Sequence, residues 1–282
     1  MDICTSKHEM REALAPLRAS GASIGLVPTM GYLHAGHGAL VQTAARHCNH
    51  VAASIFVNPT QFGPSEDLAS YPRDPGRDLA MLRDAGVAAV FMPAPDEMYH
   101  PHAQTNVETA ALSGILIGAH RPGHFRGVAT VVTKLLNIVQ PTHAFFGRKD
   151  YQQLAVIRTM VRDLDIPVKI IGVPTQRDAD GLALSSRNVR LTADQRAAAP
   201  ALNAALDWAE TTLPRDPLTV EELAAALATR LAATPGADVQ SVDIRDADTL
   251  AALTGPLLRP AVILLAVKFG DVLLIDQRVV TP

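Results

Sequence analysis

The stretch IGLVPTMGYLHAGH, residues 24–37, decides how the first half of the chain folds. Its apolar start, Ile24 to Pro28, predicts a short buried strand, and a helical pattern follows from about His37 to Cys48. Between them, Gly31 and Gly36 permit tight turns and a close approach of the backbone to a ligand. A helix that begins near His37 would direct free N–H groups and its positive dipole end toward the sheet edge. The stretch therefore predicts a strand, a loop and a helix that together bind an anion.

Strand-like and helix-like segments alternate on the C-terminal side of this stretch. Further strands are expected at 51–57, 87–92, 143–146 and 168–173. Helices are expected from the Asp74–Pro75 cap to a stop at Gly86, and over 128–139 and 151–164. Strands separated by helices of this length favour βαβ units, so the predicted fold class is α/β with a parallel sheet. Ligands of such sheets bind beyond the carboxyl ends of the strands, and each motif discussed below follows a strand.

The pattern changes after about Pro174, where a polar segment begins. Thr192 with Gln195, and Thr219 with Glu222, fit capping boxes that open Ala-rich helices. Strands are then expected at 239–244, 261–268 and 272–275, with a hairpin turn at 270–271. We therefore expect two domains, residues 1–175 and a smaller α+β domain of residues 176–282.

Composition excludes several classes of protein. The chain has 282 residues, 48% of them hydrophobic and 19% charged, which is typical of a packed globular protein. A formal net charge of −3 disfavours binding to nucleic acid or to an anionic membrane by charge alone. The two cysteines, Cys4 and Cys48, suit a reducing, cytoplasmic setting. The N-terminus has no apolar signal segment, and the apolar run at 261–267 is too short to span a bilayer.

The two histidines of the first stretch suggest a polyphosphate site. His34 and His37 are three residues apart and can both face the helix N-terminus, where imidazole groups can donate hydrogen bonds to growing negative charge. The same spacing also suits a metal ion, although no third ligand is evident nearby. A purely structural turn is the other alternative. The chain has neither a P-loop nor a G-x-G-x-x-G fingerprint after a strand, which disfavours a P-loop kinase and a nicotinamide enzyme.

Three later motifs add polar groups after other strands. In 58–63, Gln61 can hold a hydroxyl or carboxylate, although a solvated turn amide is the simpler interpretation. In 147–153, Lys149 suits a phosphate, Asp150 suits ribose hydroxyls and Gln153 follows one turn later; a surface ion pair is the alternative. The polar segment 184–188 is either a lid for phosphates or a capping turn. The basic loop 120–127 reads by default as solvated.

Taken together, six blocks resemble the pantoate–β-alanine ligase family of the HxGH nucleotidylyltransferase superfamily. The blocks are PTMGYLHAGH, IFVNPTQFG, YPRD, HRPGHFRGV, FFGRKDYQQ and DGLALSSRN, and they lie in order between residues 24 and 190. The resemblance implies a Rossmann-like N-terminal domain with helices on both faces of the sheet, a smaller C-terminal domain that closes over the active site, and a homodimer. It also implies condensation of pantoate with β-alanine through a pantoyl adenylate, with ATP consumed as co-substrate and Mg²⁺ as cofactor.

The resemblance also assigns roles to individual residues. The catalytic residues implied are His34, His37, Lys149 and Arg187, with His37 as proton donor. The implied pantoate contacts are Met30, Gln61 and Gln153, with Gln61 also beside β-alanine. No metal ligand is assigned. The implied ATP contacts are Met30, Gly31, His34, Gly36, His37, Gly147, Arg148, Lys149, Asp150, Gln176, Leu184, Ser185, Ser186 and Arg187.

Four positions depart from the common family pattern. Arg148 stands where Glu or Gln is common, Gln176 where Val is common, Leu184 where Met is common, and Gly38 where a larger residue is frequent. If the adenine contact at Gln176 is made by backbone atoms, the change there is tolerable; a side-chain contact would put the adenine fit in doubt.

Two other functions are compatible with parts of this pattern. Another superfamily member would transfer AMP to a phosphorylated acceptor, but Gln61 and Gln153, with no extra basic cluster, favour a singly charged carboxylate. A non-catalytic nucleotide- or RNA-binding module is the second alternative, which the balanced charge and the presence of Lys149 and Arg187 disfavour.

Overall fold

The computed structural model describes residues 1–64, 66 and 68–281. These residues form two compact units, and the larger one comprises Met1–Arg148 and Gln152–Pro174. The smaller unit comprises Lys149–Tyr151 and the chain from Thr175 onward. The chain therefore changes unit after Pro174, and a three-residue segment around Lys149 groups with the smaller unit. We describe each unit by itself.

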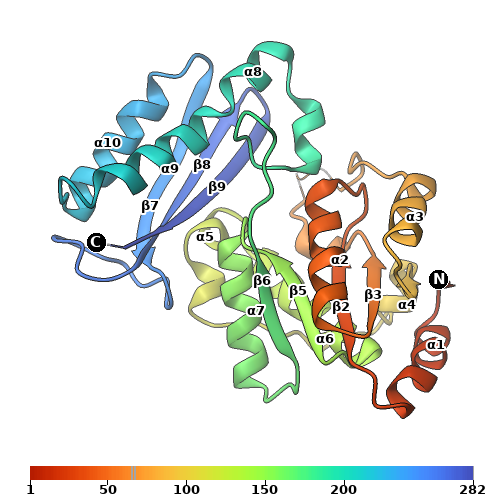
Figure 1. Ribbon diagram of the computed structural model, residues 1–282. Coiled ribbons are helices and arrows are strands. Elements are labelled where there is room, and N and C mark those ends of the chain that lie inside the picture. The colour runs from red at the N-terminus through yellow and green to blue at the C-terminus, as the bar shows by residue number, and fades with distance from the viewer. Residues whose placement is uncertain (65, 67, 282) are drawn as a thin grey trace. The chain divides into compact units, whose positions relative to one another are not determined.

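The larger unit is built on a six-stranded sheet in the order β1-β4-β3-β2-β5-β6 (Figure 1). Every strand pair in this sheet is parallel, as the sequence pattern predicts. The strands are β1 (Asp2–Cys4), β2 (Ile24–Thr29), β3 (His50–Ile55), β4 (Ala89–Phe91), β5 (His143–Gly147) and β6 (Lys169–Val173).

Two hydrophobic clusters cover the two faces of this sheet. Because side chains alternate along a strand, Leu26 belongs to one cluster and its neighbour Val27 to the other. The Leu26 face packs against α1 (Lys7–Ala19), α6 (His124–Val139) and α7 (Tyr151–Asp163). The Val27 face packs against α2 (Ala35–His47) and α3 (Pro75–Asp84). Helices on both faces of a parallel sheet confirm the predicted Rossmann-like class.

Short helices occupy the connections of the larger unit, namely η1 (Pro59–Gln61), α4 (Pro95–Met98), η2 (Leu112–Gly114) and α5 (Ile117–His120). Several details differ from the sequence prediction; helix α6, for example, begins at His124 and not at 128. The strand β1 and helix α1 at the N-terminus were not predicted, although Ser6 and Glu9 form a capping box there. Helix α2 begins at Ala35, two residues before the predicted start, because the His34 side chain caps it.

The smaller unit has a three-stranded antiparallel sheet, with β7 (Ala237–Asp246), β8 (Ala261–Phe269) and β9 (Val272–Val280) in that order. Helices α9 (Ala201–Thr212) and α10 (Val220–Ala232) pack against it (Figure 1). Before them come η3 (Ser186–Arg190) and α8 (Ala193–Ala198). Both predicted capping boxes are present, at Thr192 and Thr219. Strand β9 continues five residues beyond its predicted end at Ile275. Within the described residues, no helix has the length and apolarity needed to cross a membrane.

Candidate active site

The sheet of the larger unit has a topological switch point between β2 and β5. From β2 the chain passes to β3 on one side, whereas β5 pairs with β2 on the other side, where Leu26 faces Ala144. Ligands of open α/β sheets bind outside the carboxyl ends of the strands at such a point. The loop with both histidines follows β2 and ends at α2, and the Gly147 motif follows β5. Topology thus places these two motifs at neighbouring strand ends.

The hydrogen bonds of the histidine loop define which ring nitrogen of each imidazole carries the proton. Nδ1 of His34 accepts the backbone N–H of Gly36 at 3.1 Å, and Nδ1 of His37 accepts the backbone N–H of His34 at 3.2 Å. An imidazole nitrogen that accepts a hydrogen bond carries no proton, so the neutral rings hold theirs on Nε2. The ring centroids are 4.1 Å apart. With Nδ1 of each ring as an acceptor, the Nε2–H groups are donors, which suits an anionic ligand.

A buried carboxylate holds the backbone of the same loop. Asp78, on α3, is 1% exposed, and its two oxygens each accept a backbone N–H at 2.7 Å, from Tyr32 and from Leu33. Gly31 and Tyr32 both have positive φ angles, 85° and 52°, and such angles are unusual for a residue with a side chain. The carboxylate thus stabilises a strained turn three residues before the first histidine. The local sequence does not indicate this role of Asp78, because its partners lie 45 and 46 residues away.

The amide of Gln61 is buried and oriented by its neighbours. Its Oε1 accepts a hydrogen bond from Nδ2 of Asn58 at 3.0 Å, and its Nε2 lies 3.3 Å from the sulfur of Met30. The simpler interpretation of Gln61 as a solvated turn amide is therefore wrong. The Oε1 atom of the amide thus faces Asn58, and its Nε2 group lies beside Met30. This brings two of the three predicted pantoate residues together.

Asn58 links this amide to helix α6. The sequence alone does not predict this role of Asn58. Asn58 is 1% exposed; its Nδ2 also donates to the carbonyl of Gly127 at 3.2 Å, and its Oδ1 accepts the hydroxyl of Tyr99 at 2.7 Å. The start of α6 lies so close to η1 that a Cβ atom on Gly127 would stand 2.4 Å from the carbonyl oxygen of Thr60. Burial raises the pKa of Tyr99, which keeps its hydroxyl protonated as the donor to Asn58.

The basic loop at residues 120–127 also contacts the Gln61 turn. Nδ1 of His124 lies 2.8 Å from the carbonyl oxygen of Gln61, and Arg121 pairs with Glu66 through Nε at 2.8 Å and through a second, shorter contact. The hydrogen bond from Arg121 lowers the pKa of Glu66, while burial acts in the opposite direction. The interpretation of this loop as merely solvated is therefore wrong for these two side chains.

The motif after β5 spans the boundary between the two units. Arg148 belongs to the larger unit, where its backbone N–H donates to the carbonyl of Val173 and its side-chain Nε donates to the carbonyl of Gly172 at 3.1 Å. Gln153 is half-buried at the start of α7. Its neighbour Gln152 is buried and bonds three backbone groups around η2 and α5, so it is a structural residue. The predicted ligand roles of Arg148 and Gln153 stay predictions.

Lys149 groups with the smaller unit, among several charged side chains. Burial lowers the pKa of Lys149, the carboxylates of Asp150 and Asp276 act against that effect, and the guanidinium groups of Arg187 and Arg177 add to it. The smaller unit therefore brings the predicted phosphate ligands Lys149 and Arg187 into one electrostatic neighbourhood. Two basic side chains in one neighbourhood suit a polyphosphate.

The remaining predicted nucleotide contacts lie in the polar linker of the smaller unit. The carbonyl of Gln176 accepts the backbone N–H of Leu184 at 2.9 Å, so these two residues close a turn. Ser185 caps η3 by accepting the backbone N–H of Arg187 at 3.3 Å. The predicted capping turn is thus present in this segment. A ligand role for Ser186 and Arg187 stays a prediction.

The parallel sheet and its switch point define a protein of the Rossmann-like class, whose ligands generally bind outside the carboxyl ends of the strands. The family model for pantoate-beta-alanine ligase matches residues 2–279. The chain therefore belongs to the pantoate–β-alanine ligase family, and the resemblance stated from the six sequence blocks is confirmed.

Known proteins are similar over the full length of the chain. A pantothenate synthetase of Sinorhizobium medicae is 50% identical over 282 residues, which is 100% of this chain and 97% of that protein. The crystal structure of pantothenate synthetase from Thermus thermophilus has a TM-score of 0.94 at 45% identity and covers 100% of both chains. The pantoate-beta-alanine ligase from Francisella tularensis, complexed with beta-gamma ATP and beta-alanine, has a TM-score of 0.81 at 35% identity, over 99% of this chain and 97% of that one.

Proposed function

We propose that this protein condenses pantoate with β-alanine at the expense of ATP, releasing AMP and pyrophosphate. The observation that carries the proposal is the histidine loop, whose two imidazoles follow β2 at the switch point of the sheet. We further propose that the enzyme acts as a homodimer in the cytoplasm. The family resemblance supports the dimer, and the free cysteines Cys4 and Cys48 suit a reducing compartment.

The first step makes the carboxylate of pantoate reactive. A carboxylate oxygen attacks the α-phosphorus of ATP, the bond to the bridging oxygen of the β-phosphate breaks, and pyrophosphate leaves with that electron pair. Negative charge grows on the phosphates in this transition state, and fixed donors that oppose it lower the barrier. In the proposal, His34 and His37 donate from Nε2, and Lys149 and Arg187 contribute positive charge. The Nδ1 bonds of the two histidines fix the orientation of their rings.

The second step forms the amide bond. The neutral amine of β-alanine attacks the acyl carbon of the pantoyl adenylate, AMP leaves, and the amine loses a proton. Gln61 is proposed to hold the substrates because its amide lies beside Met30 with its Oε1 engaged by Asn58. An acyl adenylate hydrolyses readily, so water must be excluded from the site. Closure of the smaller domain and its linker is proposed to do this.

Magnesium is proposed to enter with the nucleotide, as MgATP. The described residues contain no group of three or more His, Cys, Asp or Glu side chains arranged to hold a metal ion. Mg²⁺ in nucleotide enzymes commonly keeps several waters and binds the phosphates, with few protein ligands. The residues of this chain therefore fit an ion held mainly by the triphosphate, and none of them is assigned as its ligand.

The proposal is tested by incubating the protein with pantoate, β-alanine and MgATP and analysing the products by mass. Pantothenate, AMP and pyrophosphate are expected in equal amounts. An exchange assay between ATP and labelled pyrophosphate then separates the alternatives. Exchange that depends on pantoate supports the ligase, exchange that requires a phosphorylated acceptor supports a nucleotidylyltransferase, and no exchange at all supports a binding module.

A further inference from the structure

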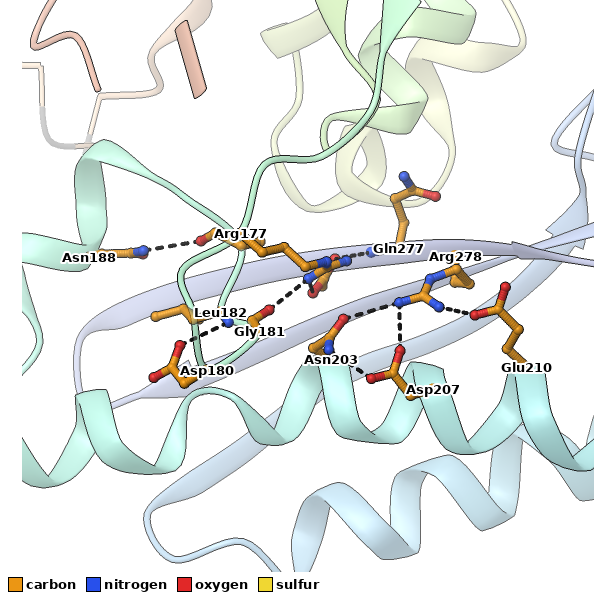
Figure 2. Close-up of polar contacts among 12 residues, drawn as sticks. Arg177, Asp180, Gly181, Leu182, Asn188, Asn203, Asp207, Glu210, Gln277 and Arg278 are labelled. Carbon is orange, nitrogen blue, oxygen red and sulfur yellow. Dashed lines mark hydrogen bonds and ion pairs between the residues drawn. The ribbon is translucent and has the colours of Figure 1, made fainter. Parts of the chain in front are cut away.

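A buried ion pair joins the polar linker of the smaller unit to strand β9. Arg177 donates two hydrogen bonds to the carboxylate of Asp276, from Nη1 at 2.6 Å and from Nη2 at 2.9 Å. The side chain of Asp276 is 2% exposed and that of Arg177 is 20% exposed. Two parallel bonds of this kind fix the direction of a guanidinium as well as its position. Figure 2 shows Arg177 reaching from the linker toward β9.

The same guanidinium organises the linker. Nη1 of Arg177 also donates to the carbonyl of Gly181 at 3.1 Å (Figure 2). The backbones of Arg177 and Ala183 form an isolated antiparallel bridge. Nδ2 of Asn188, in η3, donates to the carbonyl of Ala183 at 3.1 Å. These contacts link Asp276 through Arg177 to the turn at 177–183, and the turn through Asn188 to η3, the element that contains Ser186 and Arg187.

Asp276 also acts on Lys149. Burial lowers the pKa of Lys149; the carboxylates of Asp150 and Asp276 act against that effect, and Arg187 and Arg177 add to it. One buried carboxylate therefore acts on both elements that carry the predicted phosphate ligands of the smaller unit.

We propose that Asp276 is a positioning residue of the nucleotide site, which holds the linker through Arg177 and supplies a counter-charge to the Lys149 ammonium. This inference rests on the proposed function, because it assigns Lys149 and Arg187 to the triphosphate. Stability alone does not account for the pair, since a buried ion pair is often no more stabilising than apolar side chains of similar size.

The decisive variant is Asp276→Asn, which keeps the shape of the side chain and removes its charge. The readout is the titration of Lys149, followed by NMR in protein labelled at lysine Cε. The chain has only five lysines, which makes assignment practical: Lys7, Lys134, Lys149, Lys169 and Lys268. The Lys149 titration should move to lower pH by about one unit, because loss of a nearby opposite charge disfavours the ammonium. The alkaline limb of kcat/KM for MgATP should move in the same direction.

The matched control is Asp207→Asn. Asp207, on α9, pairs at 2.8 Å with Arg278 (Figure 2). Arg278 lies on β9, two residues after Asp276, and Asp207 is not among the named causes of the Lys149 pKa shift. This variant should leave the Lys149 titration and the pH profile unchanged. If Asp276→Asn does not fold, the double variant Arg177→Met/Asp276→Leu avoids an unpaired buried guanidinium. Its Lys149 titration should also move to lower pH, by a smaller amount, because one opposing positive charge is lost as well.

The result that overturns the inference is a Lys149 titration and alkaline limb that stay at their wild-type positions in the folded Asp276 variant. An equal movement in Asp207→Asn also overturns it, since the effect would then be general. The NMR titration requires no catalysis, so a wild-type protein that makes no pantothenate would refute the proposed function and leave this measurement to decide the role of Asp276 separately.

Discussion

Removal of the Asp78 carboxylate should both destabilise the protein and slow adenylation. In Asp78→Ala, the backbone N–H groups of Tyr32 and Leu33 lose their partner inside the protein, where Asp78 itself is 1% exposed. An unsatisfied buried donor costs about 1–3 kcal/mol, so two cost about 2–6 kcal/mol. That is a large part of the roughly 5–15 kcal/mol by which a typical domain is stable. Asp78→Asn keeps one acceptor oxygen and should lose about half as much.

The free energy of unfolding is to be measured in urea, with Asp84→Asn as the control. Asp84 is exposed at the end of the same helix, α3, and its replacement should change stability by less than about 0.5 kcal/mol. Pyrophosphate formation by folded Asp78→Asn should fall as well, because the turn before His34 loses one of its two anchors. If Asp78→Ala unfolds within about 1 kcal/mol of wild type, the two hydrogen bonds do not hold the loop and the reasoning fails.

Three further outcomes are expected. Lys149→Ala should lower the rate of pyrophosphate formation by about 10²–10³-fold, the scale of one transition-state donor, and a near-normal rate would remove Lys149 from the site. Gln61→Ala should raise the KM for pantoate and leave that for ATP nearly unchanged, as checked by steady-state kinetics; an unaltered pantoate dependence would exclude the assigned role. Because Arg121 lowers the pKa of Glu66, the pair stabilises the fold above the usual glutamate pKa, and this stability is lost as the pH falls through the lowered value. The Tm of Glu66→Gln should therefore lie below wild type at pH 7 and approach it in acid; equal Tm values at pH 7 would contradict this.

The order of strands and helices was accessible from the sequence because it depends on local signals. Alternating apolar runs, the Asp74–Pro75 cap and the capping boxes at Thr192 and Thr219 each act within a few residues, and the structure has all of them. The start of α2 was misplaced by two residues, because a histidine is an unusual N-cap and its pattern does not stand out in the sequence.

The residues that support the predicted site through distant hydrogen bonds could not be predicted from local sequence. Asp78, Asn58 and Asp276 bond groups that lie 45, 69 and 99 positions away in the chain. Nothing in the local sequence around a buried carboxylate or amide indicates which distant N–H it will meet. The sequence thus predicts the ligand-binding motifs through their composition, whereas the supporting contacts require the fold.

The near contact between Gly127 and Thr60 limits how this enzyme can be altered. Any side chain at position 127 would collide with a backbone carbonyl, which cannot move aside as a flexible side chain does. The packing of α6 against η1 therefore leaves no room for a side chain at position 127. Asn58 is hydrogen-bonded to both elements, through Gln61 and Gly127. Under the proposed function, variants meant to accept a bulkier acid should keep Gly127 and Asn58 and begin with Met30, an adaptable thioether beside the Gln61 amide.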